Sequence, residues 1–228
     1  MELHLQSARD NKGLIRDYVH STLKKNIMEL RLEPGRFISE KDVIEMLQVS
    51  RTPIREAFVK LAQEELIETV PQKGSFISLI DWQHVEESRF IRETLESAVV
   101  REACTVLSSE QVLHLQNLIN LQQLCAAEKN YERLFELDEE FHKAIITGCG
   151  KIRTWNMIQQ MSTHYNRIRF LRLASNTDWE SILEQHQGLV QAIRDKQEDA
   201  AGKIMKEHLS MGDIDKDQLK EKYPSYFK

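Results

Sequence analysis

Residues 49–66 read VSRTPIREAFVKLAQEEL, and this stretch has the spacing of an amphipathic helix. Thr52 is expected to cap the helix, with Pro53 in the first helical position, where proline is tolerated. The apolar residues that recur at helical spacing, and form the expected buried stripe, are Ile54, Phe58, Leu61 and Ala62. The basic residues that remain for the outer side are Arg51, Arg55 and Lys60.

Two further helices are expected before this stretch, and a β-hairpin after it. Residues 14–30, LIRDYVHSTLKKNIMEL, are amphipathic, and Pro34 with Gly35 marks a turn. Ser39 can cap the following helix, SEKDVIEMLQ. Residues 66–80, LIETVPQKGSFISLI, contain two β-prone runs separated by the turn sequence PQKG. Three helices followed by a hairpin predict a winged helix-turn-helix.

The third helix of such a domain can enter the major groove of DNA. Arg51 or Arg55 could then bond the edge of a guanine in a bidentate manner, worth roughly 1 to 3 kcal/mol of discrimination per contact. Lys73 and Gly74, in the turn of the hairpin, would meet the DNA backbone or the minor groove. The same pattern also fits a solvated helix face, and periodicity alone does not choose between the two interpretations.

Residues 34–78, PGRFISEKDVIEMLQVSRTPIREAFVKLAQEELIETVPQKGSFIS, closely resemble the DNA-binding domain of the GntR family of bacterial transcription regulators, with its VSRTPVREAL-type signature and glycine-tipped wing. The resemblance implies that the recognition-helix contacts fall on Arg51, Thr52 and Arg55. It places the wing tip at Lys73 and Gly74, and phosphate contacts at Lys41 or Arg36. Gln48 departs from the family, which usually has glycine there; glutamine in a left-handed turn would cost some stability without altering the groove contacts.

The whole chain has the composition of a globular protein: 228 residues, 41% hydrophobic and 29% charged. No apolar run approaches the roughly 20 residues that span a bilayer, and the start, MELHLQSARDNKG, lacks the layout of a secretory signal. We therefore expect a cytoplasmic protein without a membrane partner. The net charge of −5 does not by itself indicate nucleic acid. The cysteines are far apart and form no CxxC, which disfavours disulfides and thiolate zinc sites.

Proline marks the division into domains. Three of the four prolines, Pro34, Pro53 and Pro71, lie in the first third of the chain, and the other is Pro224. Nothing therefore breaks helices by ring closure between 72 and 223. We expect a winged domain at 1–79 and an all-α domain at 80–228.

The second domain reads as consecutive helices joined by short connections. Ser108 with Gln111, and Thr177 with Glu180, have the spacing of capping boxes. Gly148 stands at a helix end. The expected helices are 81–107, 109–128, 131–147, 151–174, 178–196 and 198–211. The fold class is thus mainly α: a winged helix-turn-helix with a small hairpin, followed by an antiparallel helical bundle.

Four of the eight histidines stand 22 residues apart, at 142, 164, 186 and 208. We interpret this regularity as coincidence, because helix breaks interrupt it and no other residue type recurs with it. Asp138 and His142 share a helical stripe with Leu134, Phe141 and Ile145, and His186 and His208 also lie on apolar stripes.

A single histidine on an apolar stripe is more often a hydrogen-bonded core residue than a metal ligand. Three histidines and an aspartate that converge from three helices are different, since their burial without partners would be expensive. Neutral imidazoles and one carboxylate suit a divalent transition metal, with zinc preferred and nickel or manganese as alternatives. The predicted ligands are Asp138, His142, His186 and His208.

The second domain resembles the FCD effector-binding domain of the FadR-type branch of GntR regulators, through RETLE at 92–96, DEEFH at 138–142, EQH at 184–186 and KEHL at 206–209. In metal-binding members of that branch an aspartate and three histidines hold the ion, and the four matching positions are all present. The arginine of the RxxLE pattern borders the pocket in the family, which implies an effector contact for Arg92; an ion pair with a glutamate is the alternative. His164 is an effector contact, an extra ligand or a core residue.

The sequence therefore predicts a homodimeric transcription regulator that binds a palindromic operator in double-stranded DNA. Its helical domain would bind a small organic acid or sugar acid beside the metal, and the expected sign is repression relieved by the effector. A regulator that binds its effector without metal is a further possibility.

A metal-dependent hydrolase that uses the same Asp/His cluster is the competing class. It lacks a recognisable general base, because the chain has no HExxH helix and Glu139 and Glu140 are expected to face elsewhere. We therefore expect no enzyme.

Overall fold

The computed structural model describes residues 14–174, 179–210 and 216–228. These residues divide into two compact units. The first contains the residues up to Trp82 together with 166–171 and 217–228, and the second contains the described residues of 83–165 and 172–216. Each unit is built around its own core.

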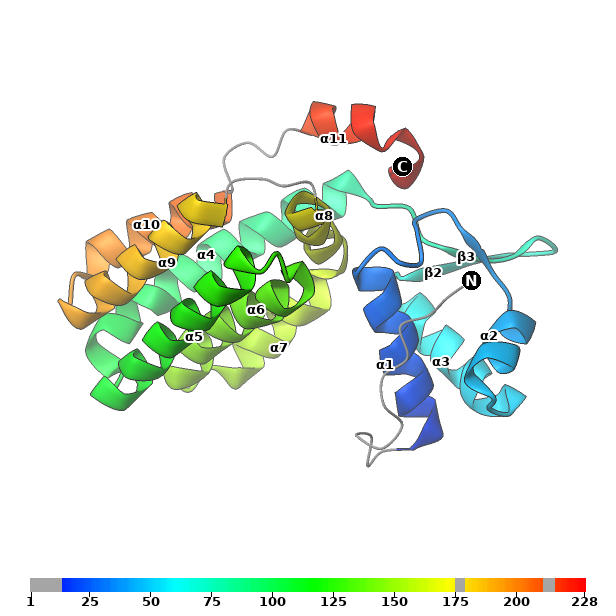
Figure 1. The fold of residues 1–228 in the computed structure, drawn as a ribbon, viewed down its shortest axis with the longest axis horizontal. Coiled ribbons are helices and arrows are strands. Elements are labelled where there is room, and N and C mark those ends of the chain that lie inside the picture. The colour runs from blue at the N-terminus through cyan, green and yellow to red at the C-terminus, as the bar shows by residue number, and fades with distance from the viewer. Residues whose placement is uncertain (1–13, 175–178, 211–215) are drawn as a thin grey trace. The chain divides into compact units, whose positions relative to one another are not determined.

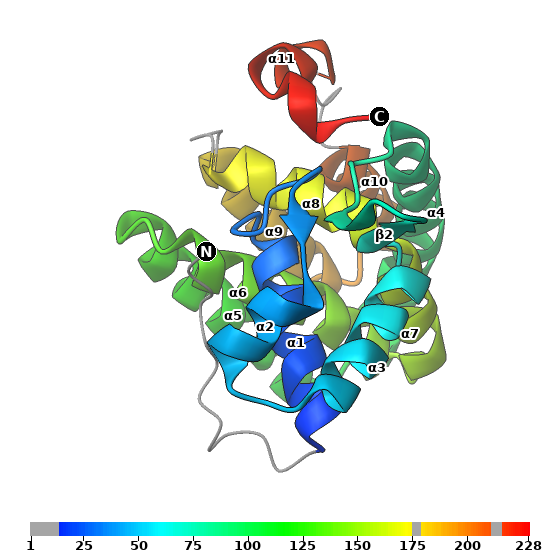
Figure 2. The same ribbon diagram turned by 90° about the vertical axis from the view of Figure 1, so that its right-hand side faces the viewer.

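The first unit is a winged helix-turn-helix, in which α1 and α3 lie side by side (Figures 1 and 2). Its helices are α1 (Ile15–Met28), α2 (Glu40–Leu47) and α3 (Arg51–Gln63). Its antiparallel sheet has the order β1-β3-β2, from β1 (Phe37–Ile38), β2 (Ile67–Val70) and β3 (Gly74–Ile77). The hairpin of β2 and β3 is the predicted wing. The sequence did not predict β1, because a strand of two residues has no measurable periodicity.

The recognition helix α3 differs from the prediction at its start and in its buried stripe. It begins at Arg51, with Ser50 as the extended N-cap residue, so Thr52 lies inside the first turn and does not cap the helix. Ala62 is exposed, whereas Ala57 is buried. The buried face is thus Ile54, Ala57, Phe58 and Leu61, a spacing of three, four and seven residues that excludes position 62.

The turn between α2 and α3 confirms the expected left-handed backbone. The Oγ of Ser39 caps α2 by accepting a hydrogen bond from the backbone N–H of Asp42 at 3.0 Å. Gln48 ends the helix at φ 53° and ψ 40°. Its side-chain amide donates to the carbonyl oxygen of Glu45, which satisfies one of the open carbonyls at this helix end.

The second unit is an antiparallel bundle of long helices (Figure 1). Its main helices are α4 (Trp82–Val106), α5 (Ser109–Ala127), α6 (Tyr131–Gly148), α7 (Ile152–Met161), α9 (Trp179–Arg194) and α10 (Glu198–Ser210), together with the ends of α8 (Thr163–Ala174). The fold class predicted from the sequence is therefore confirmed.

The sequence predicted one continuous helix over 151–174, and this was wrong, because Ser162 separates α7 from α8. The hydroxyl of Ser162 donates to the carbonyl oxygen of Ile158 at 2.7 Å, a back-bond that bends helices. The hydroxyl of Ser88 donates to the carbonyl oxygen of Met161, so this acceptor has a partner outside its own helix.

The C-terminal residues form more structure than the charged tail that the sequence predicted. A helix, α11 (Lys216–Lys222), precedes a 3-10 turn at Pro224–Tyr226. The backbone of Ile80 bonds to this segment on both sides, and the ring of Phe227 packs on Trp82 at 5.9 Å between ring centroids. The segment is therefore a part of the first unit.

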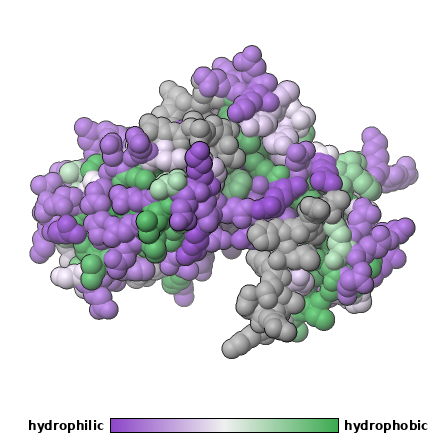
Figure 3. Space-filling model, viewed as in Figure 1, coloured by the Kyte–Doolittle hydropathy of each residue, from purple (hydrophilic) through white to green (hydrophobic). Residues whose placement is uncertain are grey.

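The surface and the cysteines agree with the composition. On the face shown in Figure 3, hydrophilic residues cover most of the surface and hydrophobic residues form separate patches. Cys104 and Cys149 are buried, Cys125 is half-buried, and all three are unpaired. In the described ranges, no helix is long and apolar enough to cross a membrane.

The capping box at the start of α5 gives a test of the fold. The Oγ of Ser108 accepts from the backbone N–H of Gln111, and the Gln111 side chain accepts from the backbone N–H of Ser108. Ser108→Ala should lower the free energy of unfolding by about 1 kcal/mol. Urea unfolding of the full chain measures this. The control Ser109→Ala changes an exposed residue one position later, and equal costs for the two variants would contradict the role of the cap. The second predicted capping box begins at Thr177, which lies outside the described residues.

Candidate metal centre and DNA-binding surface

The structure brings the four predicted ligands together in the helical unit. Asp138 and His142 stand one turn apart on α6, His186 comes from α9 and His208 from α10. All four are buried, and one ligand atom of each lies within 4.8 Å of the others. The Nε2 atom of His208 is 3.1 Å from that of His142 and 3.4 Å from that of His186. The carboxylate of Asp138 is 3.9 Å from the Nε2 of His142 and 3.6 Å from that of His186.

The other ring nitrogen of each histidine is held by an oxygen acceptor. The Nδ1 of His142 is 2.6 Å from the carboxylate of Glu96. The Nδ1 atoms of His186 and His208 are 2.8 Å and 3.0 Å from the amide oxygens of Gln122 and Gln185, respectively. The amide nitrogen of Gln122 donates to the Leu137 carbonyl, which fixes its oxygen toward His186. Because carboxylate and amide oxygens only accept, each Nδ1 carries a proton.

This arrangement is suited to a cation. With the protons on Nδ1, neutral rings carry lone pairs on the three Nε2 atoms that face one another. Lone pairs at 3.1 Å repel unless a proton or a metal ion lies between them. Three imidazole nitrogens and a carboxylate are a donor set that zinc and other divalent transition metals accept. Hydrogen-bonded outer nitrogens are also what metal-ligating histidines have. The residues present therefore fit an ion.

Glu96 connects this cluster to Arg92. One oxygen of Glu96 bonds His142, and the other lies 2.5 Å from the Nε of Arg92. Both residues are 1% exposed. Burial favours the neutral form of Glu96, but Arg92 and His142 outweigh it and hold the pKa of Glu96 well below its usual range. Burial likewise opposes the charge of Arg92, but Glu96 and Glu139 raise its pKa above the ordinary value. The two residues thus form a charged pair.

The outer end of Arg92 is less completely bonded. Among the described residues, its two terminal nitrogens have no hydrogen-bond partner. The nearest carboxylate is that of Glu139, 3.7 Å from one of them, and the ring centroid of Tyr165 lies 5.3 Å from the Cζ of Arg92. Buried guanidinium nitrogens without a partner are costly. Glu139 is not one of the four clustered side chains: its carboxylate lies beside Arg92 and accepts from Gln159.

His164 is placed away from the four clustered side chains. It is buried on α8, with its ring edge-on to His84 at 5.2 Å between centroids. Its regular spacing from His142 and His186 therefore has no counterpart in space.

The DNA-reading residues predicted from the sequence lie on the surface of the first unit. Arg36, Lys41, Arg51, Thr52, Arg55 and Lys73 are exposed, and Gly74 is half-buried. Gly74 has φ 107°, and a Cβ there would lie 2.6 Å from the ring of Phe37, so glycine is required at the wing tip.

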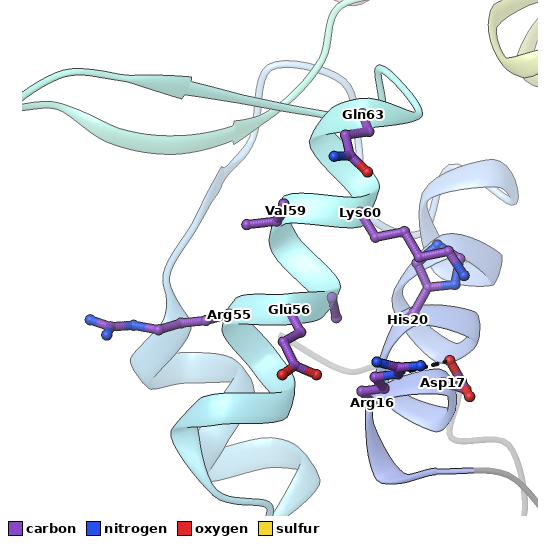
Figure 4. A pocket seen from close by; sticks show the side chains of 9 residues that line it. Arg16, Asp17, His20, Arg55, Glu56, Val59, Lys60 and Gln63 are labelled. Carbon is purple, nitrogen blue, oxygen red and sulfur yellow. Dashed lines mark ion pairs between the residues drawn. The ribbon is translucent and has the colours of Figure 1, made fainter.

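Two sides of α3 carry basic residues. Figure 4 shows Arg55 extending away from α1, whereas Lys60 points toward α1 across a groove of about 520 Å³. The side chains of Arg51 and Arg55 both bond the carboxylate of Glu40, at the start of α2. Arg51 and Arg55 thus lie on the side of α3 that faces α2, whereas Lys60 lies on the side that faces α1.

The sequence did not predict the residues that hydrogen-bond to the predicted site residues. Glu96 stands four positions after Arg92, a helical spacing that could have indicated the pair. Gln185 directly precedes His186, but the amide bonds His208 on the neighbouring helix. Gln122 and Glu40 act across helices, and no local pattern indicates such contacts.

The chain matches two family models and several curated proteins. Residues 16–77 match the bacterial regulatory proteins of the gntR family, and residues 87–211 match the FCD domain. The HTH-type transcriptional repressor RspR of Escherichia coli K12 is 30% identical over 195 residues, which cover 86% of each chain. The Nta operon transcriptional regulator of Aminobacter aminovorans is 29% identical, over 77% of this chain and 82% of that one.

Solved structures share the fold. McbR/YncC of Escherichia coli superposes with a TM-score of 0.77 at 21% identity, covering 92% of this chain and 99% of the other. A GntR regulator from Rhodococcus sp. RHA1 gives a TM-score of 0.75 at 20% identity, with 88% and 97% covered. These likenesses, together with the winged unit and the helical bundle, show that the chain belongs to the gntR family of bacterial regulatory proteins, as a DNA-binding transcription regulator with an FCD domain, and is not an enzyme.

Proposed function

We propose that this regulator is controlled by a small carboxylate that binds beside a divalent transition metal ion in the helical unit. Asp138, His142, His186 and His208 would hold the ion, with zinc as the preferred metal. The observation that carries this proposal is the set of three Nε2 atoms turned toward one another, each on a ring whose other nitrogen is fixed. When bound, the ion supplies positive charge and open coordination positions for an anion.

The surroundings of Arg92 support a carboxylate as the class of effector. Its buried terminal nitrogens present the fork that matches a carboxylate. Glu96 bonds both Arg92 and the ligand His142, so the anion site lies next to the ion site. A small organic acid or sugar acid that offers one carboxylate to Arg92 and a further oxygen to the ion fits this pair. His164 is a second candidate for an effector contact.

The DNA-binding function would use Arg51, Thr52 and Arg55 in the major groove, Lys73 and Gly74 at the wing tip, and Arg36 or Lys41 on phosphate. We further propose that the protein acts as a homodimer on a palindromic operator, because a two-fold protein reads a two-fold site. We propose that the protein represses transcription and that binding of the effector relieves this repression. Relatives named as repressors, RspR and the gluconate operon repressor of Bacillus licheniformis, support repression.

The recognition helix is tested with alanine variants. Arg51→Ala and Arg55→Ala should each weaken binding to the operator about 5- to 150-fold, since a bidentate base contact is worth about 1 to 3 kcal/mol. Binding to a DNA fragment from the protein's own upstream region, measured across a salt series beside a scrambled fragment, checks this. Lys60→Ala is the matched control, because it removes a charge whose side chain points toward α1 from the same helix. If both arginine variants bound every fragment like the wild type, the assignment would be wrong.

The metal site is tested by chelation. Native protein should contain close to one equivalent of metal per chain, and a chelator should lower its melting temperature, because an ion at about 100 times its Kd stabilises the fold by about 2.7 kcal/mol. His186→Ala should contain little metal and melt equally with and without chelator. His114→Ala, an exposed histidine on α5, should behave like the wild type. Metal-free native protein with an unchanged melting curve would instead support an effector bound directly by the polar cluster.

The charged link between the ion and anion sites is tested by Glu96→Gln. The variant leaves Arg92 buried with only the more distant Glu139, so the free energy of unfolding should fall by about 3 kcal/mol in metal-free protein. Glu93→Gln is the matched control: its partner Arg89 is partly exposed at 3.8 Å, and the loss should stay below about 1 kcal/mol. In a double-mutant cycle, Arg92→Leu should recover part of the loss in Glu96→Gln. Equal losses for the two glutamine variants would contradict the link.

A further inference from the structure

Two recognition-helix arginines share one carboxylate. Glu40 is the first residue of α2, and Arg51 and Arg55 stand one turn apart at the start of α3. The Nε of Arg51 lies 2.8 Å from one oxygen of Glu40. The Nε of Arg55 lies 3.2 Å from both oxygens. The contact spans the turn of the helix-turn-helix and ties the two helices together.

The atoms that make this contact leave the reading edge of each arginine open. A guanidinium group has five N–H donors, and one of them, on Nε, is directed to Glu40 in each case. The terminal nitrogens are the pair that bonds the O6 and N7 of guanine. The side chains of Arg51 and Arg55 are 64% and 58% exposed, so these nitrogens remain accessible. In Figure 4, the side chain of Arg55 extends away from α1, although the residue is one of those that line the groove.

A negative charge on a DNA-binding face has an electrostatic cost. Non-specific binding depends on the number of phosphates that the protein neutralises, and a carboxylate beside two arginines reduces the effective positive charge there. Glu40 is only partly exposed, and hydrogen bonding from Arg51 lowers its pKa, so it stays ionised at neutral pH. The negative charge of Glu40 therefore weakens binding to any DNA. A residue whose role was to increase DNA affinity would not have this effect.

Resting on the proposed recognition role of Arg51 and Arg55, we propose that Glu40 is a positioning residue that sets the sequence specificity of this regulator. By holding both Nε atoms, it orders two long side chains before DNA binds, and this reduces the entropy lost when they contact bases. By its charge, it disfavours phosphate contacts that need no particular sequence. The ordering of the two arginines raises the ratio of specific to non-specific affinity, whereas the charge weakens binding to the operator and to other DNA alike. Neither effect requires Glu40 to touch DNA.

The test compares Glu40→Gln with Asp42→Asn in the full-length protein. Asp42 lies in the same first turn of α2 and is exposed. In the described part of the chain it makes no hydrogen bond or ion pair with the two arginines, so it controls for the loss of one negative charge near the helix start. Both variants should bind a scrambled DNA fragment several-fold more tightly than the wild type at low salt. Only Glu40→Gln should also lower the ratio of operator to scrambled affinity, by about tenfold.

Two further variants separate positioning from a structural role. Glu40→Asp keeps the charge but shortens the reach, and it should also lower the ratio while its melting temperature stays near that of the wild type. In an Arg51→Ala, Arg55→Ala background, Glu40→Gln should leave the ratio unchanged, because the residues it acts through are gone. The proposal would be overturned if Glu40→Gln and Asp42→Asn had the same ratio of operator to scrambled-fragment affinity. If the two arginine variants alone left the ratio unchanged, the proposed recognition role would fail instead.

Discussion

The interior of the helical unit depends on the contacts that the buried carboxylate of Glu96 makes with Arg92 and His142. A buried carboxylate is tolerated only when charges and donors surround it, and here Arg92 and His142 each occupy one oxygen. Arg92 in turn needs this anion, since it is itself 1% exposed. His142 gains a fixed orientation from the same bond. One side chain therefore accounts for the burial of an arginine and for the direction of a candidate ligand nitrogen.

The first unit uses a carboxylate in the same way but at a different depth. Glu40 also bonds two partners, but they are more than half exposed, and exposed ion pairs contribute only about 0 to 1 kcal/mol to stability. Breaking this pair would cost little folding free energy, so its consequence lies in the arrangement of the arginines. Burial thus distinguishes the two carboxylates. The buried carboxylate of Glu96 supports the fold of its unit, whereas the partly exposed carboxylate of Glu40 leaves Arg51 and Arg55 able to exchange partners.

Helical periodicity predicted most of the fold, and it failed where a side chain competes with the backbone. The stripes of α5, α6, α9 and α10 were visible in the sequence because their apolar residues repeat every three or four positions. The helix break at Ser162 was not visible in the sequence, because a single hydrogen bond from a serine hydroxyl to a carbonyl oxygen leaves no periodic signal. The four clustered side chains could be predicted since each lies on an apolar stripe. Their partners Glu96, Gln122 and Gln185 could not, because those bonds join different helices.

Those partners connect the candidate ion site to most of the bundle. Glu96 comes from α4, Gln122 from α5 and Gln185 from α9, while the four candidate ligands lie on α6, α9 and α10. A shift of any of these helices therefore changes the direction of a ring nitrogen, and a ligand that fixes the rings restrains the helices in return. Since Arg92 shares Glu96 with His142, an anion that bonds Arg92 acts on the same set of contacts. A metal ion and an anion bound at the proposed sites would thus be linked through one carboxylate, that of Glu96.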